Sequence, residues 1–251
     1  SSDLCSIMNR KERLDVLLQE RHPQLTRNQI QSFIMQGMVR VDGQVVTKAG
    51  KIISQDALLE FDDFTPKYVC RAGFKLEKAL EHFGINVTGF VVMDAGLSTG
   101  GFTDCLLQKG AAKVYGIDVG HNQVHEKIRH DPRVSVMEQT NLRYVTSVGE
   151  LVDLVTLDLA FISVLKVMHV VKAILKPGGF LVVLIKPQFE AARSQVGKGG
   201  VIKDEVIHAQ VVAQVTEGIV LNGFLLEGVI ESPLLGSAGN KEFLAFFRKN
   251  A

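Results

Sequence analysis

The sequence has few of the features that would place a protein outside a cell or in a membrane. It holds only three cysteines among 251 residues, at no spacing typical of zinc ligands, so we expect a reducing compartment. It has no run of about 18 apolar residues that could span a bilayer and no basic-then-apolar signal peptide. These absences predict an intracellular protein with no membrane partner, cytoplasmic if bacterial. Because the chain begins at Ser1 and not at Met, an organelle reached by a removed targeting segment is the alternative.

The chain also lacks a strong net charge. Its 28 Lys and Arg oppose 27 Asp and Glu, so nucleic-acid binding would need locally clustered charge. Residues 10–51 hold such a cluster, with eight Lys or Arg against four acids. Flanking acids return this segment to neutral, and an ordinary solvated face is an equal alternative on charge alone. The hydrophobic share of 46% is enough for a sizeable core.

Residues 10–61 have the pattern of a small α+β domain. Leucines at helical spacing predict a helix over 11–20, and Thr26 with Gln29 forms a capping box that begins a second helix. The dipeptide Asp42-Gly43 is typical of a two-residue hairpin between short strands. A trailing apolar stretch predicts one further strand in this domain.

This order of elements resembles the RNA-binding module first seen in a small-subunit ribosomal protein and found in many RNA-modifying enzymes. The resemblance covers most of residues 11–61 and is most specific in the segment Gly37-Met38-Val39-Arg40-Val41-Asp42-Gly43. It implies contacts with RNA phosphates, which position an enzyme without reading base sequence. The residues that it places against RNA are Arg13, Thr26, Arg27 and Arg40.

After a linker predicted at 62–70, residues 71–251 alternate between helix and strand patterns. Continuous apolar runs such as 181–185 are typical of parallel strands buried on both faces. A short connection over 232–241 implies that the last strand is antiparallel. We therefore predict an α/β domain with a Rossmann-like, mostly parallel sheet. The expected helices are 74–83, 101–109, 121–129, 163–175 and 204–221, and the expected strands are 90–94, 113–118, 134–138, 151–158, 180–186, 224–231 and 242–248.

A glycine-rich turn joins the first strand of this domain to a helix. A strand that ends in an acid, followed by such a turn and a helix N-terminus, is how α/β folds hold a nucleotide-like ligand. The order D-x-G-x-x-x-G-G differs from the dinucleotide pattern G-x-G-x-x-G. Taken alone, the turn suits another nucleotide ligand or tight packing equally well. The cofactor-binding residues that we predict here are Asp94, Gly96, Ser98, Thr99, Gly100, Gly101 and Phe102.

Asp118 narrows the choice of ligand. It ends the next apolar run, where a carboxylate can accept hydrogen bonds from two ribose hydroxyls. The nearby loop has no pair of Lys or Arg of the kind that grips a pyrophosphate. This combination favours a cofactor with a ribose and no phosphate, and S-adenosylmethionine fits that description.

Ionisable residues stand at the ends of three predicted strands. Asp158 and Lys186 each end a long apolar strand, and Glu242 begins the antiparallel one, so all three are expected at one sheet edge. Lys75, on the helix before the first strand, is a fourth candidate. Each residue alone is more often a surface charge. Together, a carboxylate and a second ammonium can orient a central lysine that removes a proton from an alcohol, whose oxygen then attacks the cofactor methyl group in line.

Several segments of the chain together resemble one family over nearly its full length. They are Arg71–Leu76, Asp94–Asp104, Tyr115–Gly120, Asn141–Arg143, Asp158 with Phe161–Ser163, Lys186–Glu190 and Gly239–Phe243. In these segments the chain is similar to the TlyA (hemolysin A-like) group of FtsJ-like rRNA 2′-O-methyltransferases. The resemblance implies a class I methyltransferase fold, S-adenosylmethionine as cofactor, and methylation of a cytidine ribose in ribosomal RNA or ribosomal subunits.

The same resemblance implies roles for individual residues. The catalytic tetrad of the family falls on Lys75, Asp158, Lys186 and Glu242. Lys186 is implied as the base, and Asn141 and Asp158 join the cofactor-binding set. Ala72 stands where the family usually has glycine, and Leu159-Ala160 replaces the usual pair after the aspartate. Both departures lie beside catalytic positions, so they bear on rate and geometry more than on reaction type.

Other motifs favour other chemistry only weakly. The segment that begins at Asp158 lacks the prolines of amino-group methyltransferases, and neither Cys70 nor Cys105 lies where a cytosine C5-methyltransferase would need its nucleophile. His121 and His125 have a spacing that could hold a metal, but no third ligand is evident nearby. We therefore expect an exposed helix face there and no metal.

The glycine-rich loop from Pro187 to Lys203 is expected to be mobile over 193–203. Its Arg193 and Lys198 are predicted to bind RNA, and an ordered surface loop is the equal alternative. Two other functions stay open. A non-catalytic RNA-binding or ribosome-assembly factor has no reason to keep the four ionisable residues. A membrane-lysing hemolysin would need a spanning segment. The oligomeric state is not assigned.

Overall fold

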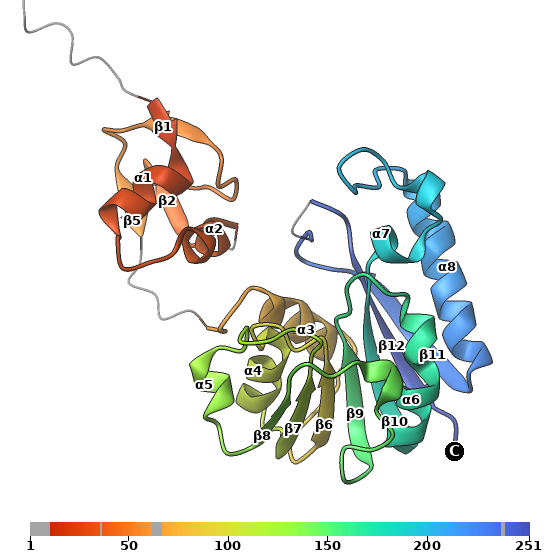
Figure 1. The fold of residues 1–251 in the computed structure, drawn as a ribbon. Helices are drawn as coiled ribbons and strands as arrows, with labels where there is room; N and C mark the ends of the chain where they lie inside the picture. The colour runs from red at the N-terminus through yellow and green to blue at the C-terminus, as the bar shows by residue number, and fades with distance from the viewer. Residues whose placement is uncertain (1–10, 36, 62–66, 237–238) are drawn as a thin grey trace, which may run out of the picture. The chain divides into compact units, whose positions relative to one another are not determined.

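A computed structural model of the chain describes residues 11–35, 37–61, 67–236 and 239–251. The chain divides into two compact units, Ser1–Cys70 and Arg71–Ala251 (Figure 1). Arg10, the first residue of the predicted RNA-binding domain, lies outside the described residues, as do residues 62–66 of the predicted linker. No helix in the described part of the chain has the length and apolar character needed to cross a bilayer.

The described part of the N-terminal unit has two short helices and two small sheets, one of them the three-stranded sheet β3-β2-β5 (Figure 1). Its elements are β1 (Lys11–Arg13), α1 (Leu14–Arg21), α2 (Arg27–Met35), β2 (Val39–Val41), β3 (Gln44–Val45), β4 (Ile52–Ser54) and β5 (Leu59–Phe61). The predicted capping box begins α2, because the Thr26 N–H donates to Gln29 Oε1 at 2.8 Å and the Gln29 N–H donates to Thr26 Oγ1 at 3.3 Å. Asp42 and Gly43 both have positive φ angles, 51° and 78°, which suit the predicted hairpin between β2 and β3.

Strands β1 and β4 form a two-stranded antiparallel sheet that the sequence pattern did not predict. Each has only three residues, too few for an alternating pattern to be recognised. The helix expected from residue 11 therefore begins at Leu14. Leu14, Leu18 and Ile30 are fully buried in the core of this unit, and each contributes about 2 kcal/mol through burial.

The C-terminal unit is an α/β fold built on a seven-stranded sheet (Figure 1). Its strands are β6 (Val91–Ala95), β7 (Lys113–Ile117), β8 (Val134–Met137), β9 (Val152–Leu157), β10 (Leu175–Ile185), β11 (Phe224–Glu231) and β12 (Phe243–Lys249). They lie in the order β11-β12-β10-β9-β6-β7-β8. Strand β12 is antiparallel to β10 and β11, and the other neighbouring pairs are parallel. The predicted mostly parallel sheet with an antiparallel last strand is confirmed.

The order of the strands determines where a ligand can bind. Strand β6 has β7 on one side and β9 on the other, so successive connections leave it in opposite directions. In such sheets ligands bind outside the carboxyl ends of the strands, where the order reverses. The helices of this unit are α3 (Ala72–His82), α4 (Gly101–Gln108), α5 (Glu126–Arg129), α6 (Met168–Ile174), α7 (Pro187–Glu190) and α8 (Glu205–Leu221), with 3₁₀ turns η1 (Leu142–Tyr144), η2 (Val164–Val167) and η3 (Arg193–Gln195).

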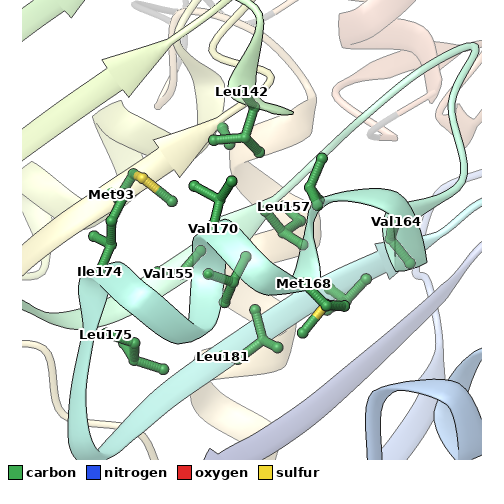
Figure 2. Packing of buried hydrophobic residues seen from close by; sticks show 14 of the residues in the cluster. Met93, Leu142, Val155, Leu157, Val164, Met168, Val170, Ile174, Leu175 and Leu181 are labelled. Atoms are coloured by element: carbon green, nitrogen blue, oxygen red, sulfur yellow. The ribbon is translucent and has the colours of Figure 1, made fainter. Parts of the chain in front are cut away.

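An apolar core holds β9 and β10 in place (Figure 2). Val155 and Leu157 of β9 and Leu181 of β10 are fully buried, and α6 adds Val170 and Ile174 to the same cluster. Interiors of this kind are packed as densely as organic crystals. The residues that follow β9 and β10 therefore project from a rigid base.

The helix predicted over 121–129 is the short α5, which begins only at Glu126. Asn122 has a positive φ of 54°, which bends the chain before the helix. His125 Nδ1 accepts a hydrogen bond from the Lys127 N–H at 3.1 Å and so caps α5. The two histidines of this segment therefore do not share a helix face. No group of three His, Cys, Asp or Glu side chains in the described part of the chain is placed to hold a metal.

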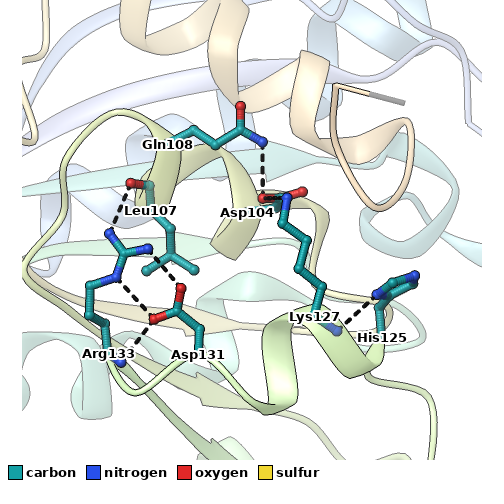
Figure 3. Close-up of polar contacts among 7 residues, drawn as sticks. All are labelled: Asp104, Leu107, Gln108, His125, Lys127, Asp131 and Arg133. Atoms are coloured by element: carbon teal, nitrogen blue, oxygen red, sulfur yellow. Dashed lines mark hydrogen bonds and ion pairs between the residues drawn. The ribbon is translucent and has the colours of Figure 1, made fainter. Parts of the chain in front are cut away.

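Polar contacts tie the segment around α5 to α4 (Figure 3). Lys127 Nζ lies 2.9 Å from Oδ1 of the buried Asp104, and Gln108 Nε2 donates to the same oxygen at 3.0 Å. Arg133 donates to the carbonyl oxygen of Leu107 at 3.3 Å. These contacts hold in place the helix that follows the glycine-rich turn.

Candidate active site

A pocket of about 610 Å³ lies at the carboxyl ends of the central strands, where the strand order reverses. Turns after β6, β7, β9 and β10 contribute to its wall, as does the segment before η1. The sequence-predicted residues that line it are Gly96, Ser98, Asp118, Asn141, Asp158 and Lys186. Its volume is in the range of pockets that hold small organic ligands.

The Asp118 carboxylate is held at this pocket by two backbone groups. The Ser98 N–H donates to Oδ2 at 2.7 Å and the Gly120 N–H donates to Oδ1 at 2.6 Å. Ser98 adopts a positive φ of 48°, so the glycine-rich turn bends sharply at the point where it meets Asp118. Because a carboxylate has about four acceptor positions, Asp118 is oriented and still able to accept hydrogen bonds from a ligand.

Gly96 allows the turn after β6 to pass close to the turn after β9. It has a φ of 88°, and a Cβ at this position would overlap the carbonyl oxygen of Asp158. The Asp158 N–H also donates to the carbonyl oxygen of Ala95 at 2.9 Å. Only glycine combines this backbone conformation with so close an approach.

Asp94 is the last but one residue of β6, is 1% exposed and does not line the pocket. Thr103 of α4 and Thr156 of β9 each donate a hydroxyl hydrogen bond to it at 2.7 Å. Burial, opposed by these hydrogen bonds, raises the pKa of Asp94 to about 6. Through these hydrogen bonds Asp94 links α4 to β9 and so supports the glycine-rich turn between β6 and α4.

The other predicted residues of the turn shape its backbone or pack at the start of α4. Thr99 accepts a hydrogen bond from the His125 N–H through its carbonyl oxygen at 3.1 Å. Gly100 has a φ of 100° at the N-cap of α4, and Gly101 and Phe102 are buried at the start of that helix. Within the described residues, the lining of the pocket includes none of Asp94, Thr99, Gly100, Gly101 and Phe102.

The four predicted catalytic residues form two ion pairs. Lys186 Nζ lies 2.6 Å from Asp158 Oδ1, with the two side chains 15% and 17% exposed. Lys75 Nζ is paired with Glu242 Oε2, and these side chains are only 7% and 3% exposed. In the ladder between β10 and β12, Ile185 pairs with Phe243. The next residues outward, Lys186 and Glu242, are therefore neighbours at one sheet edge.

Three residues beside the pocket were not predicted as part of the site. Phe161 lines the pocket, is 90% exposed and has a positive φ of 65°. Its ring centroid lies 5.1 Å from that of Phe189. Glu190 accepts a hydrogen bond from the Val164 N–H at 2.8 Å, which links α7 to η2. Phe161, Phe189 and Glu190 stand in family-like segments of the sequence, but their contacts depend on how two distant turns meet.

In the N-terminal unit, two predicted RNA-binding residues share one buried acid. Arg13 Nε lies 2.9 Å from Asp15 Oδ1, and Arg27 Nη2 lies 3.1 Å from Asp15 Oδ2. Gln31 Nε2 donates to the same carboxylate at 2.7 Å. The hydrogen bond from Arg13 is the main cause that holds the pKa of Asp15 well below its usual range. The arginine side chains are 47% and 50% exposed, so both guanidinium groups also reach solvent.

Asp15 was not singled out from the sequence. Its position between the buried residues Leu14 and Leu17 was the available signal, since an acid on the apolar face of a helix needs a partner. Thr26 uses its hydroxyl in the capping box. The other predicted RNA-binding residues are exposed, namely Arg40 on β2, Arg193 in η3 and Lys198 in the following loop.

Comparison with known proteins places this geometry in a family. Residues 68–249 match the family described as FtsJ-like methyltransferase, and residues 12–59 match the S4 domain. The chain is 41% identical over 244 residues to a Mycobacterium tuberculosis protein named 16S/23S rRNA (cytidine-2'-O)-methyltransferase TlyA, a match covering 96% of this chain and 91% of that protein.

Two further relatives show the same extent of similarity. Hemolysin A of Brachyspira hyodysenteriae is 41% identical over 239 residues, covering 94% of this chain and 99% of that protein. A solved structure from Streptococcus thermophilus, provisionally named a hemolysin, has a TM-score of 0.74 at 41% identity and covers 96% of this chain and 89% of that one. As its sequence resemblance implied, the chain belongs to the FtsJ-like methyltransferases and carries an S4 domain.

Proposed function

We propose that this protein transfers a methyl group from S-adenosylmethionine to the 2′-hydroxyl of a cytidine ribose in ribosomal RNA. The observation that carries the proposal is the ion pair of Lys186 and Asp158 at the wall of the pocket that also presents Asp118. A relative that is 41% identical over nearly the full chain bears the name of this activity.

The residues of the pocket suit the proposed cofactor. Asp118 is oriented by two backbone N–H groups and can accept hydrogen bonds from the two hydroxyls of a ribose. Gly96 keeps the floor of the pocket free of a side chain. Asn141 lies in the same wall, where its Oδ1 accepts from the Arg143 N–H at 3.1 Å. When bound, S-adenosylmethionine supplies an electrophilic methyl group.

Lys186 is the residue that we assign to the proton of the target hydroxyl. A ribose 2′-hydroxyl is a poor nucleophile until that proton is removed. Nζ of Lys186 can accept it only after the ammonium has lost its own proton to solvent, and accepting the hydroxyl proton restores the ion pair with Asp158. Asp158 fixes the position of Nζ through the 2.6 Å contact. The buried pair of Lys75 and Glu242 adds a fixed, largely desolvated dipole beside Lys186, where electrostatic interactions are stronger than in water.

Phe161 has a place in this proposal as a surface for the target nucleotide. Its ring is 90% exposed beside Asp158 and is supported on one side by Phe189. Single-stranded or flipped-out bases in RNA are commonly stacked on aromatic side chains. A base stacked there would bring its ribose to the mouth of the pocket.

The S4 domain provides the second half of the proposal, which is binding of ribosomal RNA. Arg13 and Arg27 are anchored on Asp15 and half exposed, so they can reach phosphate groups without losing their orientation. Arg40 is exposed on β2 of the same unit. Such contacts would position the enzyme, while the pocket selects the nucleotide.

The test is transfer of a labelled methyl group from S-adenosylmethionine to ribosomal subunits, followed by nuclease digestion of the RNA. We expect the label in 2′-O-methylcytidine. Label in a methylated base, or in another ribose, would correct the reaction or its target. Tight binding of rRNA without any label under conditions that saturate both ligands would identify a non-catalytic RNA-binding factor instead.

A further inference from the structure

The glycine-rich loop that precedes α8 is built around a turn with a lysine near its tip. The Gly200 N–H donates to the carbonyl oxygen of Gly197 at 3.0 Å, and the Gly197 N–H donates to that of Val201 at 3.2 Å. Lys198 occupies the second position of this turn and is exposed. Ile202, two residues after this turn, is only 3% exposed. One end of the loop is therefore anchored while the lysine faces solvent.

Asn240 makes the first part of this anchor. It is 1% exposed and lies in the connection between β11 and β12, far from the loop in sequence. Its Oδ1 accepts a hydrogen bond from the Ile202 N–H at 3.0 Å, and its Nδ2 donates to the carbonyl oxygen of Gly200 at 2.9 Å. The side-chain amide thus satisfies one N–H and one carbonyl oxygen of the loop backbone, which in an exposed loop would form hydrogen bonds with water.

His208 of α8 makes the second part. It is 2% exposed, and its Nε2 lies 3.1 Å from the carbonyl oxygen of Ile202. Because a carbonyl oxygen only accepts, Nε2 carries the proton in this contact. Nδ1 has no hydrogen-bond partner among the described residues and lies 3.6 Å from Glu205 Oε2. Two buried polar side chains from different elements therefore converge on the backbone of one residue.

The same connection carries the catalytic candidate Glu242. The Gly236 N–H donates to the carbonyl oxygen of Asn240 at 2.8 Å, and the Ser232 N–H donates to that of Glu242 at 2.8 Å. A Cβ at Gly236 would overlap Glu242 Oε1, so the connection wraps closely around this carboxylate. Asn240 and Glu242 are thus two residues apart in one tightly bonded segment.

We propose that Asn240 and His208 are positioning residues for methyl transfer. They hold the turn that presents Lys198 in a fixed place relative to Glu242. An RNA phosphate bound by Lys198 would then place the target ribose next to Lys75 and Lys186. The proposal rests on the proposed function, because it assigns the loop a role toward the same RNA. None of the residues of the anchor lines the cofactor pocket, so cofactor binding should be independent of it.

Hydrogen exchange in the full chain tests the anchor without any substrate. We expect Asn240→Ala to increase exchange of the Ile202 amide at least tenfold, because this N–H loses its acceptor and the opened loop exposes it. His208→Gln keeps an amide donor for the Ile202 carbonyl, whereas His208→Phe keeps a ring against Phe243 and loses the donor. The Phe variant should open the loop more than the Gln variant. The reverse order would show that ring packing, and not the hydrogen bond, holds the loop.

Salt dependence of rRNA binding tests the link to Lys198. Removing one phosphate contact lowers the slope of log K against log salt by about 1. We expect this loss for Lys198→Ala, the same loss for Asn240→Ala, and no further loss for the double variant. Additive losses would overturn the link. A slope unchanged by Lys198→Ala would remove the lysine from the RNA contact, and with it the proposed purpose of the anchor.

Activity and cofactor binding complete the test. Asn240→Ala should raise KM for ribosomal RNA several-fold at unchanged affinity for S-adenosylmethionine, and Gln210→Ala, an exposed change on the same helix, should do nothing. A lower affinity for the cofactor would mean a general structural defect and overturn the positioning role. If the wild type transfers no methyl group to rRNA, the proposed function fails, while the exchange experiment still decides whether the anchor exists.

Discussion

In the N-terminal unit the main charge cluster buries its acid and exposes its cations, whereas in the C-terminal unit it buries both. Asp15 is fully buried, and its partners Arg13 and Arg27 are about half exposed. Lys75 and Glu242 are both nearly inaccessible. An exposed guanidinium can bind a phosphate group of a ligand that arrives from solution. A buried ammonium interacts only with groups that are bound close to it inside the protein. The contrast separates a unit suited to binding from one suited to chemistry.

One buried aspartate from each unit, Asp15 and Asp94, shows a related contrast. Asp15 has charged partners, and the hydrogen bond from Arg13 keeps its pKa well below the usual range. Asp94 has two threonine hydroxyls, and burial raises its pKa to about 6. The two acids should therefore respond to pH in opposite directions. Five substitutions test this contrast, and the one with the largest expected effect comes first.

Replacing Lys186 should have the largest effect on activity. Both Lys186→Ala and Lys186→Arg should lower the rate of methyl transfer at least about a thousandfold, because alanine has no base and arginine stays protonated. Affinity for rRNA should stay the same. The matched control is Lys176→Ala, at the other end of β10, whose Nζ lies 2.6 Å from Asp153. Full activity of the arginine variant would contradict the role of Lys186 as base.

Breaking the buried pair should mainly affect stability. Lys75→Met leaves Glu242 buried without a partner, which costs about 3–5 kcal/mol in the free energy of unfolding. Lys75→Met with Glu242→Leu removes both charges and should recover most of that loss in a urea titration while methyl transfer stays low. An active double variant would show that the pair serves only stability. Lys176→Met, in the exposed pair, should cost less than about 1 kcal/mol.

Asp94 should make the C-terminal unit less stable as pH rises. Its pKa is raised from 3.8 to about 6 in the folded chain, so the folded state binds the proton more tightly. The stabilisation is complete below pH 3.8 and is lost as pH rises through about 6, a change of roughly 3 kcal/mol. In the variant Asp94→Asn, the free energy of unfolding should change less between these pH values than it does in the wild type. An unchanged pH dependence would mean that Asp94 is ionised throughout.

Removing an exposed guanidinium should weaken RNA binding and leave chemistry intact. Arg27→Ala should lower rRNA affinity several-fold and reduce the salt slope by about 1. The rate at saturating rRNA should equal that of the wild type. Arg21→Ala is the control, because Arg21 Nη2 donates to the carbonyl oxygen of Gln55 at 2.8 Å and is not part of the Asp15 cluster. A lower rate of methyl transfer by Arg27→Ala at saturating rRNA would contradict the assignment of RNA binding to one unit and catalysis to the other.

Asp15 should give the smallest effect, confined to acid pH. Its lowered pKa stabilises the fold above the unfolded value of 3.8, and this contribution is lost as pH falls below it. The protection factors of the buried Leu17 and Leu18 amides, which correct for the intrinsic pH dependence of exchange, should therefore fall in acid. The variant Asp15→Asn cannot titrate and should lack this fall, although it is less protected at neutral pH. Identical acid profiles would exclude the ion pairs as its cause.

Local sequence patterns were enough to predict most elements of secondary structure and the ionisable residues of the site. Alternating and continuous apolar runs predicted the seven strands of the main sheet, and the dipeptide Asp42-Gly43 predicted the small hairpin, because each signal is local to a few residues. The glycine-rich turn, Asp118 and the strand-end charges were visible for the same reason. The α5 helix came out shorter than predicted, since a cap at His125 overrides the preceding pattern.

Which of these side chains come into contact follows from the three-dimensional fold and not from any local pattern. It paired Lys186 with Asp158 and Lys75 with Glu242, buried Asp15 between two arginines, and anchored the glycine-rich loop on Asn240 and His208. These contacts join residues far apart in the chain, and their existence depends on strand order, register and side-chain direction. A local sequence pattern carries no information on strand order, register or side-chain direction, because all of these are set by the packing of the whole unit.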